Sequence, residues 1–277
     1  MSKKSLFPLT ILLIFITVNS YLFITAPEPI KDNNNKEGYT FSVNEGFNIL
    51  AKLNDEYRTL YTKKIVGQGK KAGLKFDEDW LKDKVEAGPL PALFLRETAA
   101  FLEKSPIPIG LYLGSDFPIS KSNLLTGIQA EKFKEIKQDK APKYFFDAET
   151  DRNIAMFPDF AAAAACVSCH NNHENSPKTD WQLNDVMGAT TWSYPQDSLT
   201  TNQLIEWIDI FNQGAQSTYS SYLEKTKKFE TNKKPTIGEK WPSDGYFLPS
   251  EKILSDTLLH KASLFLITSI LKNKDEY

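Results

Sequence analysis

Both cysteines of the chain fall in one short motif, and this placement constrains the fold more than any other feature. The motif reads Cys-Val-Ser-Cys-His over residues 166–170, and the other 275 of the 277 residues include no cysteine. The chain is therefore not a disulfide scaffold, and a hydrophobic core must hold it together. Hydrophobic residues make up 41% of the chain and charged residues 25%, which is the balance of a globular protein with such a core. The length predicts one or two domains.

The charge balance excludes nucleic acid as the expected partner. The chain has 33 Lys and Arg residues against 35 Asp and Glu residues, a formal net charge of −2. Proteins that bind phosphate backbones normally carry a basic excess. The sequence also shows no Ser-His-Asp set, phosphate loop or paired carboxylates, so we do not expect an enzyme.

An apolar run at the N-terminus predicts export. Lys3 and Lys4 precede the uncharged stretch from Leu6 to Ala26, whose length is close to the roughly 20 residues that span a bilayer. Lysines before the run place the N-terminus in the cytoplasm. We expect residues 1–26 to be a signal anchor, a single transmembrane helix that leaves the rest on the periplasmic side of the inner membrane. The alternative is a cleaved signal and a soluble periplasmic protein.

A polar stretch and a helix start signal follow the apolar run. Residues 27–40 contain proline, aspartate, lysine and three consecutive asparagines, and we interpret them as a linker. Ser42 and Glu45 form the S-x-x-E pattern of a capping box. Apolar residues then recur at helical spacing to about Ile65. A long helix is therefore expected at the start of the domain that follows the linker.

The remaining pattern places strands in the middle of the chain and helices at its end. The expected strands cover 109–113, 144–146, 153–157 and 186–194, and the expected helices cover 93–102, 130–140, 201–229 and 250–272. A second capping box, Thr200 to Gln203, starts the third of these helices. Because the strands do not alternate regularly with helices, we predict an α+β fold with an antiparallel sheet. This sheet belongs to an expected domain over 41–197, and 198–277 forms a helical C-terminal extension.

The C-x-x-C-H motif is the attachment signature of a c-type haem. Each thiol adds to one haem vinyl group and forms a thioether, and the two intervening residues let both sulfurs reach the two vinyls. The adjacent histidine then lies beneath the iron as an axial ligand. We therefore predict that Cys166 and Cys169 carry one haem c covalently and that His170 is the proximal iron ligand.

Three other uses of these residues stay open. A thioredoxin-type redox pair is one, although no βαβ pattern surrounds the motif. A zinc site built from Cys166, Cys169, His170 and His173 is another, although four ligands within eight residues are packed more tightly than usual. A disulfide between the two cysteines is the third, and it leaves His170 without a role.

The block from Pro158 to Gly188 resembles a known family, the exported single-haem c-type domains of the Tll-like haem family, which also occur in sensor kinases and chemoreceptors. The resemblance runs from about Phe41 to Pro195. The matching positions are Asn54, Arg58, Leu60, Tyr61, Thr62, Pro89, Leu90, Pro91, Ala92, Pro158, Asp159, Ala161, Cys166, Cys169, His170, Asn171, His173, Ser176, Pro177, Lys178, Asp180, Trp181, Asp185, Val186 and Gly188. The resemblance implies a PAS-like antiparallel sheet with a long N-terminal helix and one haem.

The sixth iron ligand is not evident from the sequence. The family often has arginine where Met187 stands, and a thiolate ligand is excluded here because both cysteines are used in attachment. Met156, Met187 and His260 are the candidates, each with an ordinary packing role as the alternative. An open or water-bound iron is the remaining reading, and it would permit binding of NO, CO or O₂.

Other residues are candidate neighbours of the haem. Arg58 and Tyr61 lie one turn apart on the first helix and could supply distal donors or propionate contacts, with a surface arginine and a core tyrosine as the alternative. His173 is a candidate hydrogen-bonding neighbour of the haem. Because no kinase, cyclase or methyl-accepting region is recognised, we expect a redox or gas sensor that reports to a separate protein outside the cytoplasm. An electron-transfer cytochrome and a binding module with a structural haem are the alternatives.

Overall fold

The computed structural model describes residues 12, 14–21, 25, 40–242 and 247–274, and the chain divides into two units, 1–38 and 39–277. In the first unit, residues 14–21 are helical. No helix among the residues described here combines the length and the apolar character needed to cross a bilayer. Most of the predicted anchor (1–26) and nearly all of the predicted linker (27–40) lie outside the described residues.

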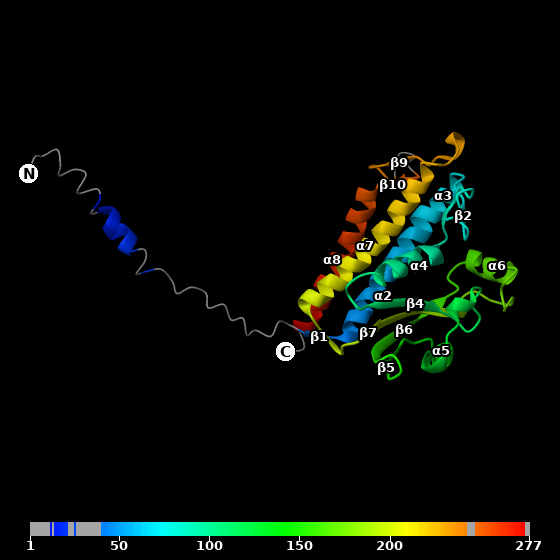
Figure 1. The fold of residues 1–277 in the computed structure, drawn as a ribbon, viewed down its shortest axis with the longest axis horizontal. Coiled ribbons are helices and arrows are strands. Elements are labelled where there is room, and N and C mark those ends of the chain that lie inside the picture. The colour runs from blue at the N-terminus through cyan, green and yellow to red at the C-terminus, as the bar shows by residue number, and fades with distance from the viewer. Residues whose placement is uncertain (1–11, 13, 22–24, 26–39, 243–246, 275–277) are drawn as a thin grey trace, which may run out of the picture. The chain divides into compact units, whose positions relative to one another are not determined.

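A four-stranded antiparallel sheet forms the centre of the second unit, with helices on both of its faces (Figure 1). The strand order is β4 (Gly110–Gly114), β7 (Val186–Tyr194), β6 (Arg152–Phe160) and β5 (Lys143–Asp147). Helix α5 (Gly127–Asp139) covers one face through a small hydrophobic cluster that includes Phe133 and Ile154. The α+β class predicted from the sequence is confirmed.

The first helix of the domain is longer than predicted and changes its geometry on the way. It starts as α2 (Val43–Leu60), continues as a π-helix over Tyr61–Val66, and ends as α3 (Gly67–Lys71). The predicted capping box is present, because the Ser42 side chain accepts from the Glu45 amide and the Glu45 carboxylate accepts from the Ser42 amide.

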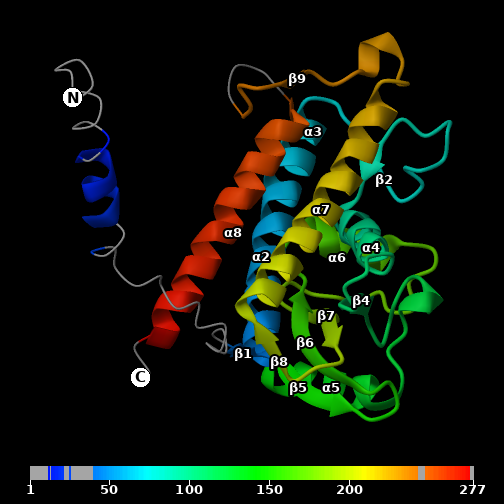
Figure 2. The same cartoon turned by 60° about the vertical axis from the view of Figure 1, so that its left-hand side comes forward.

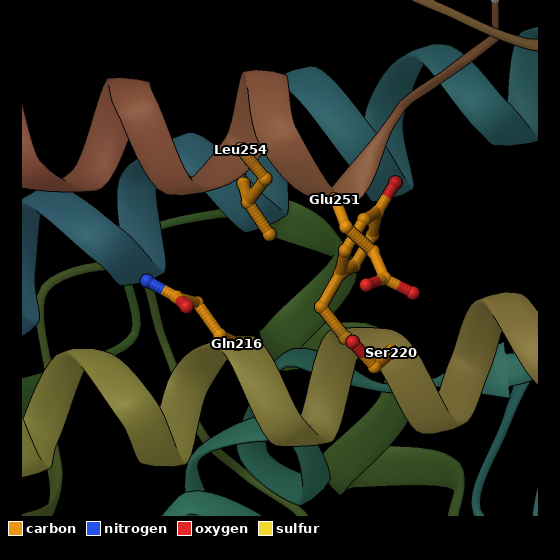
Figure 3. A pocket seen from close by; sticks show the side chains of 5 residues that line it. Gln216, Ser220, Glu251 and Leu254 are labelled. Carbon is orange, nitrogen blue, oxygen red and sulfur yellow. The ribbon is translucent and has the colours of Figure 1, made fainter.

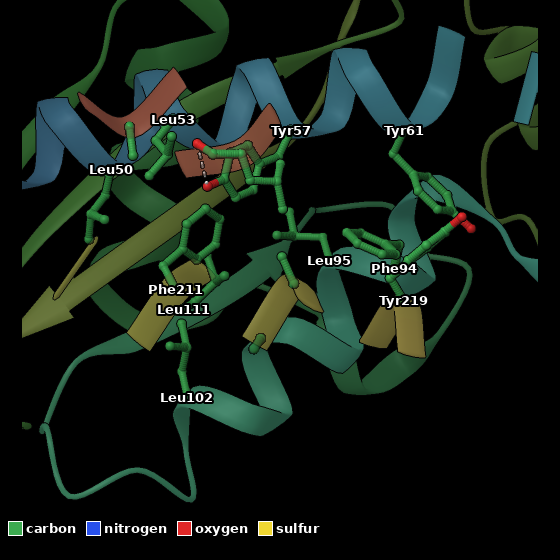
Figure 4. Packing of buried hydrophobic residues seen from close by; sticks show 14 of the residues in the cluster. Leu50, Leu53, Tyr57, Tyr61, Phe94, Leu95, Leu102, Leu111, Phe211 and Tyr219 are labelled. Atoms are coloured by element: carbon green, nitrogen blue, oxygen red, sulfur yellow. Dashed lines mark hydrogen bonds between the residues drawn. The ribbon is translucent and has the colours of Figure 1, made fainter. Parts of the chain in front are cut away.

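Three further helices pack with α2 into the main hydrophobic core. They are α4 (Pro91–Leu102), α7 (Thr201–Thr226) and α8 (Glu251–Lys274), and Figure 2 shows α8, α2 and α7 running side by side. Aromatic contacts join them: Tyr57 on α2 stacks on Phe211 of α7 at 5.3 Å between ring centroids (Figure 4). The segment 198–277, expected as an extension, therefore supplies part of the core that also holds α2 and α4.

Short elements complete the unit. β1 (Thr40–Ser42) pairs antiparallel with β8 (Ser198–Thr200), β2 (Phe76–Asp77) pairs with β3 (Gly88–Pro89), and β9 (Ile237–Gly238) pairs with β10 (Leu248–Pro249). Two 3₁₀ turns cover Lys121–Asn123 and Thr231–Lys233. One further helix, α6 (Ala164–Asn172), follows the end of β6 and contains the C-x-x-C-H motif.

Candidate functional site

The C-x-x-C-H motif lies on a helix in which no residue is fully buried. None of the nine residues of α6 is buried, and both Cys166 and Cys169 are exposed free thiols. The helix begins after Ala163, whose backbone is extended, and a run of alanines favours helix over its first turn. The structure thus presents both thiols on one short helix, open to a bound group and not joined in a disulfide.

His170 is suited to be a metal ligand. Its Nδ1 atom is buried and has no hydrogen-bond partner among the described residues. Burial lowers the pKa of His170, and the neighbouring His173 lowers it further. A lowered pKa favours the neutral imidazole, which is the form that binds metals.

Asn171 ties the C-terminal end of α6 to the rest of the domain. Its Nδ2 donates to the Trp181 carbonyl oxygen at 3.0 Å, and its Oδ1 accepts from the Trp181 amide at 2.9 Å. Trp181 is only 5% exposed. Lys178 Nζ lies 4.7 Å from the centroid of the Trp181 ring, and the Phe117 ring meets it edge-on at 6.3 Å.

His173 makes its contacts just beyond α6. Its Nε2 lies 3.2 Å from the Glu78 carboxylate, and its Nδ1 accepts from the Asn175 amide at 3.1 Å. These contacts orient His173 toward the segment after β2. Over the described part of the chain, no three His, Cys, Asp or Glu side chains form a group that could hold a metal ion, so the zinc arrangement considered from the sequence is not formed there.

Arg58 lies on α2 and reaches the end of β6. It forms an ion pair with Asp159 of β6, whose other oxygen accepts from Thr190 Oγ1 at 2.9 Å. Asp159 is the main cause that raises the pKa of Arg58, and smaller contributions come from Asp55 and from Cys166. Asp159 stands near the end of β6, the strand that precedes α6 in the chain, so the ion pair brings Arg58 to the end of the sheet that leads into the motif. The sequence matched Asp159 to a family motif and gave it no role.

Tyr61 belongs to the core instead of the motif. It is 2% exposed, its ring stacks on Phe94 at 4.2 Å, and its hydroxyl donates to the Pro89 carbonyl oxygen at 2.8 Å. Of the two roles considered from the sequence, these contacts favour a core tyrosine over a distal or propionate contact, because the hydroxyl is already hydrogen-bonded inside the protein. The alternative reading of a core tyrosine describes it.

The three candidate sixth ligands lie in different environments. Met156 is fully buried in the cluster between the sheet and α5, and alternation along β6 places it on the opposite face from Asp159. Met187 is half-buried, and its carbonyl oxygen accepts from Ser115 Oγ at 2.6 Å. His260 is exposed on α8, which packs on α2, α7 and β10. The packing role fits Met156 best. Met187 and His260 stay predicted candidates for the sixth iron ligand.

Two cavities lie along α7, and neither is lined by α6. One of about 40 Å³ lies between α7 and α8 and is lined by Gln216, Tyr219, Ser220, Glu251 and Leu254 (Figure 3). It has room for about one water molecule. The other, of about 470 Å³, lies between α7 and the segment after β2, with Trp80 and Phe229 among its lining residues.

The residues at α6 fit the group that the motif predicts. Two exposed thiols and a histidine with an unpaired ring nitrogen share one short helix in which no residue is fully buried. Exposed apolar side chains occur in the segments that adjoin Ala161, three residues before α6, namely Phe160 at 41% and Leu183 at 54%. A flat apolar macrocycle bound there would remove such surface from water.

Fold and site together define an α+β protein with a single C-x-x-C-H motif on an exposed helix beside a four-stranded sheet. The chain belongs to the Tll0287-like family, whose sequence model matches residues 30–195. This match confirms the resemblance stated from the sequence. Searches of curated proteins and of solved structures each found no match.

Proposed function

We propose that the chain is an exported, membrane-anchored monohaem c-type protein that senses redox state or a diatomic gas and reports to a separate partner. The observation that carries this proposal is α6, a helix with no buried residue that exposes both thiols of a C-x-x-C-H motif. Membership of the Tll0287-like family supports it.

Each residue at the site has a stated task in this proposal. Cys166 and Cys169 hold one haem c through thioethers, and His170 is the proximal ligand. Bound haem supplies reversible electron exchange and, where the iron has an open position, binding of NO, CO or O₂. Arg58 is a partner for a haem propionate, because a guanidinium pairs well with carboxylates. Asp159 holds Arg58 in place through their ion pair.

The compartment is part of the proposal. The lysines before the apolar run support an N-terminal anchor in the inner membrane with the haem domain on the periplasmic side. The partner is then a redox or signalling protein in the same compartment, and the near-neutral charge favours protein over nucleic acid. A cleaved signal would leave the same domain soluble in the periplasm.

An electron-transfer cytochrome is the second candidate. The exposure of α6 favours it, because a haem held there is open to a redox partner at the protein surface. A sensor and an electron carrier differ in the iron: gas binding needs an open position, and simple electron transfer does not.

An absorption experiment tests the proposal. The protein is produced with the c-type haem maturation machinery, and spectra are recorded oxidised, reduced, and reduced with CO. A covalent haem c whose reduced spectrum shifts with CO supports gas sensing, and one that CO leaves unchanged supports redox sensing or electron transfer. The variant C166S/C169S is the control and should bind no covalent haem. Absence of covalent haem from the unmodified chain would overturn the proposal.

A further inference from the structure

Helix α6 is fastened to the domain by polar contacts at one end. It contributes no buried residue, so hydrophobic packing does not fix its position. The contacts that reach from this end of the helix into the domain are the Asn171–Trp181 hydrogen bonds and, one residue beyond the helix, the His173–Glu78 contact. The Asn171 bonds are the ones that end on a buried residue.

The Asn171 side chain imitates a backbone pairing. Its amide nitrogen donates to the Trp181 carbonyl oxygen at 3.0 Å, while its amide oxygen accepts from the Trp181 backbone N–H at 2.9 Å. Two parallel bonds from one planar group fix orientation as well as distance. Trp181 is held in turn by burial and by the edge of Phe117. The pair is a rigid link between an exposed helix and the body of the domain.

The neighbouring histidine depends on this link. Metal-binding histidines are usually oriented by a hydrogen bond from the second ring nitrogen, and His170 Nδ1 has no such partner within the described residues. The position of α6 then takes a larger part in orienting the ring than it would if Nδ1 were hydrogen-bonded. Asn171 is the next residue after His170, so its hydrogen bonds to Trp181 hold the backbone next to the one that carries the His170 ring.

We propose that Asn171 is a positioning residue, which fixes His170 relative to the domain by linking α6 to Trp181. This inference rests on the proposed function, because it assigns His170 to a bound haem iron. It makes a distinct claim about the protein itself: the two hydrogen bonds order α6.

The test compares N171A with N172A. Asn172 is the matched control, because it is the adjacent asparagine and its amide donates only to Ser168 within α6. In the haem-free protein, amide hydrogen exchange over residues 164–172 should be at least tenfold faster in N171A and unchanged in N172A. The unfolding temperature should fall modestly in N171A, because the backbone N–H and carbonyl of the buried Trp181 lose their partners, and should be unchanged in N172A.

In the haem-loaded protein, N171A should alter the electron paramagnetic resonance spectrum of the ferric iron and shift the midpoint potential, and N172A should alter neither. N171D keeps the acceptor for the Trp181 N–H and loses the donor, so it should fall between N171A and the unmodified chain. Equal exchange and equal spectra in N171A and N172A would overturn the inference. A lowered unfolding temperature without a spectral change would assign Asn171 a purely structural role and would also overturn it.

The two proposals fail in different ways. If the unmodified chain takes up no covalent haem, the proposed function fails, while the exchange measurement on the haem-free protein still decides whether Asn171 orders α6. If haem attaches and N171A matches N172A, only the positioning role fails.

Discussion

Helices α2 and α6 both contribute residues to the candidate site, yet they differ in how much of each helix is buried. Nine of the eighteen residues of α2 are buried, and none of the nine residues of α6 is. Helix α2 therefore owes its position to the core, whereas α6 owes its position to a side-chain link and to whatever binds it. The difference teaches that the stability of the domain and the chemistry of the motif can be changed separately.

The largest effect on the free energy of unfolding should come from a substitution in the core around α2. Trp207 on α7 is 1% exposed, stacks on Phe47 of α2 at 5.6 Å and meets Tyr194 at 4.6 Å. W207A should lower the free energy of unfolding by about 3–5 kcal/mol, because it leaves a large cavity. Urea denaturation measures this loss, and W207F should lose clearly less. A change below about 1 kcal/mol would show that this cluster does not carry the fold.

The Arg58–Asp159 ion pair joins α2 to the end of β6. Breaking it should have an intermediate effect on the free energy of unfolding. Asp159 and Arg58 have side chains that are 20% and 32% exposed. D159N leaves the guanidinium half-buried without its counter-charge and should cost about 1–2 kcal/mol, less than for a fully buried pair. The control is K227M, which breaks the exposed Lys227–Glu224 pair and should cost close to nothing. Equal losses in the two variants would contradict a structural role for the pair.

The helix caps should have a smaller effect. The Thr200 side chain accepts from the Gln203 amide at the start of α7, and T200A should cost about 1 kcal/mol. Thr126 occupies the same position before α5 and makes no capping bond, so T126A is the matched control and should leave the unfolding midpoint nearly unchanged. A T200A loss no larger than that of T126A would refute the capping contribution.

The smallest effect on stability should come from the motif itself. C166S/C169S changes two exposed side chains on a helix without buried residues, so the haem-free protein should unfold within about 0.5 kcal/mol of the unmodified chain. The same variant should lose all covalent haem, as the absorption spectrum would show. A large loss of stability in the haem-free state would break the contrast between α2 and α6.

The parts of the fold that could be predicted are those specified by local patterns. The helix starts at Ser42 and Thr200 could be predicted because a capping box is complete within four residues. The predicted boundaries of β7 match the structure. The pairing of β1 with β8 joins residues about 160 positions apart, and no local pattern encodes it. Helix α6 was missed because a helix without a buried face has no apolar periodicity to find.

The candidate site divides in the same way. The motif residues could be named because their spacing is itself the chemical signal. Asn171 and Asp159 could not be given roles, since their partners, Trp181 and Arg58, are set by the tertiary fold. Tyr61 was considered as a haem contact because it lies one turn from Arg58, with a core tyrosine as the alternative. Its hydroxyl instead meets Pro89, a contact that depends on how the loop before α4 returns to the helix.

The π-helix after Arg58 has a consequence for how this helix could have arisen and how it can be changed. Each π turn holds one residue more than an α turn, so residues beyond Tyr61–Val66 are turned by about 100° from where a regular helix would place them. Beyond the π-helix, Gly69 packs so closely on the Phe76 ring that an added Cβ would lie 3.1 Å from the ring. Deleting a single residue here would restore regular winding and rotate α3 away from that partner. The number of residues in this segment therefore determines which way α3 faces, as much as the identity of those residues does.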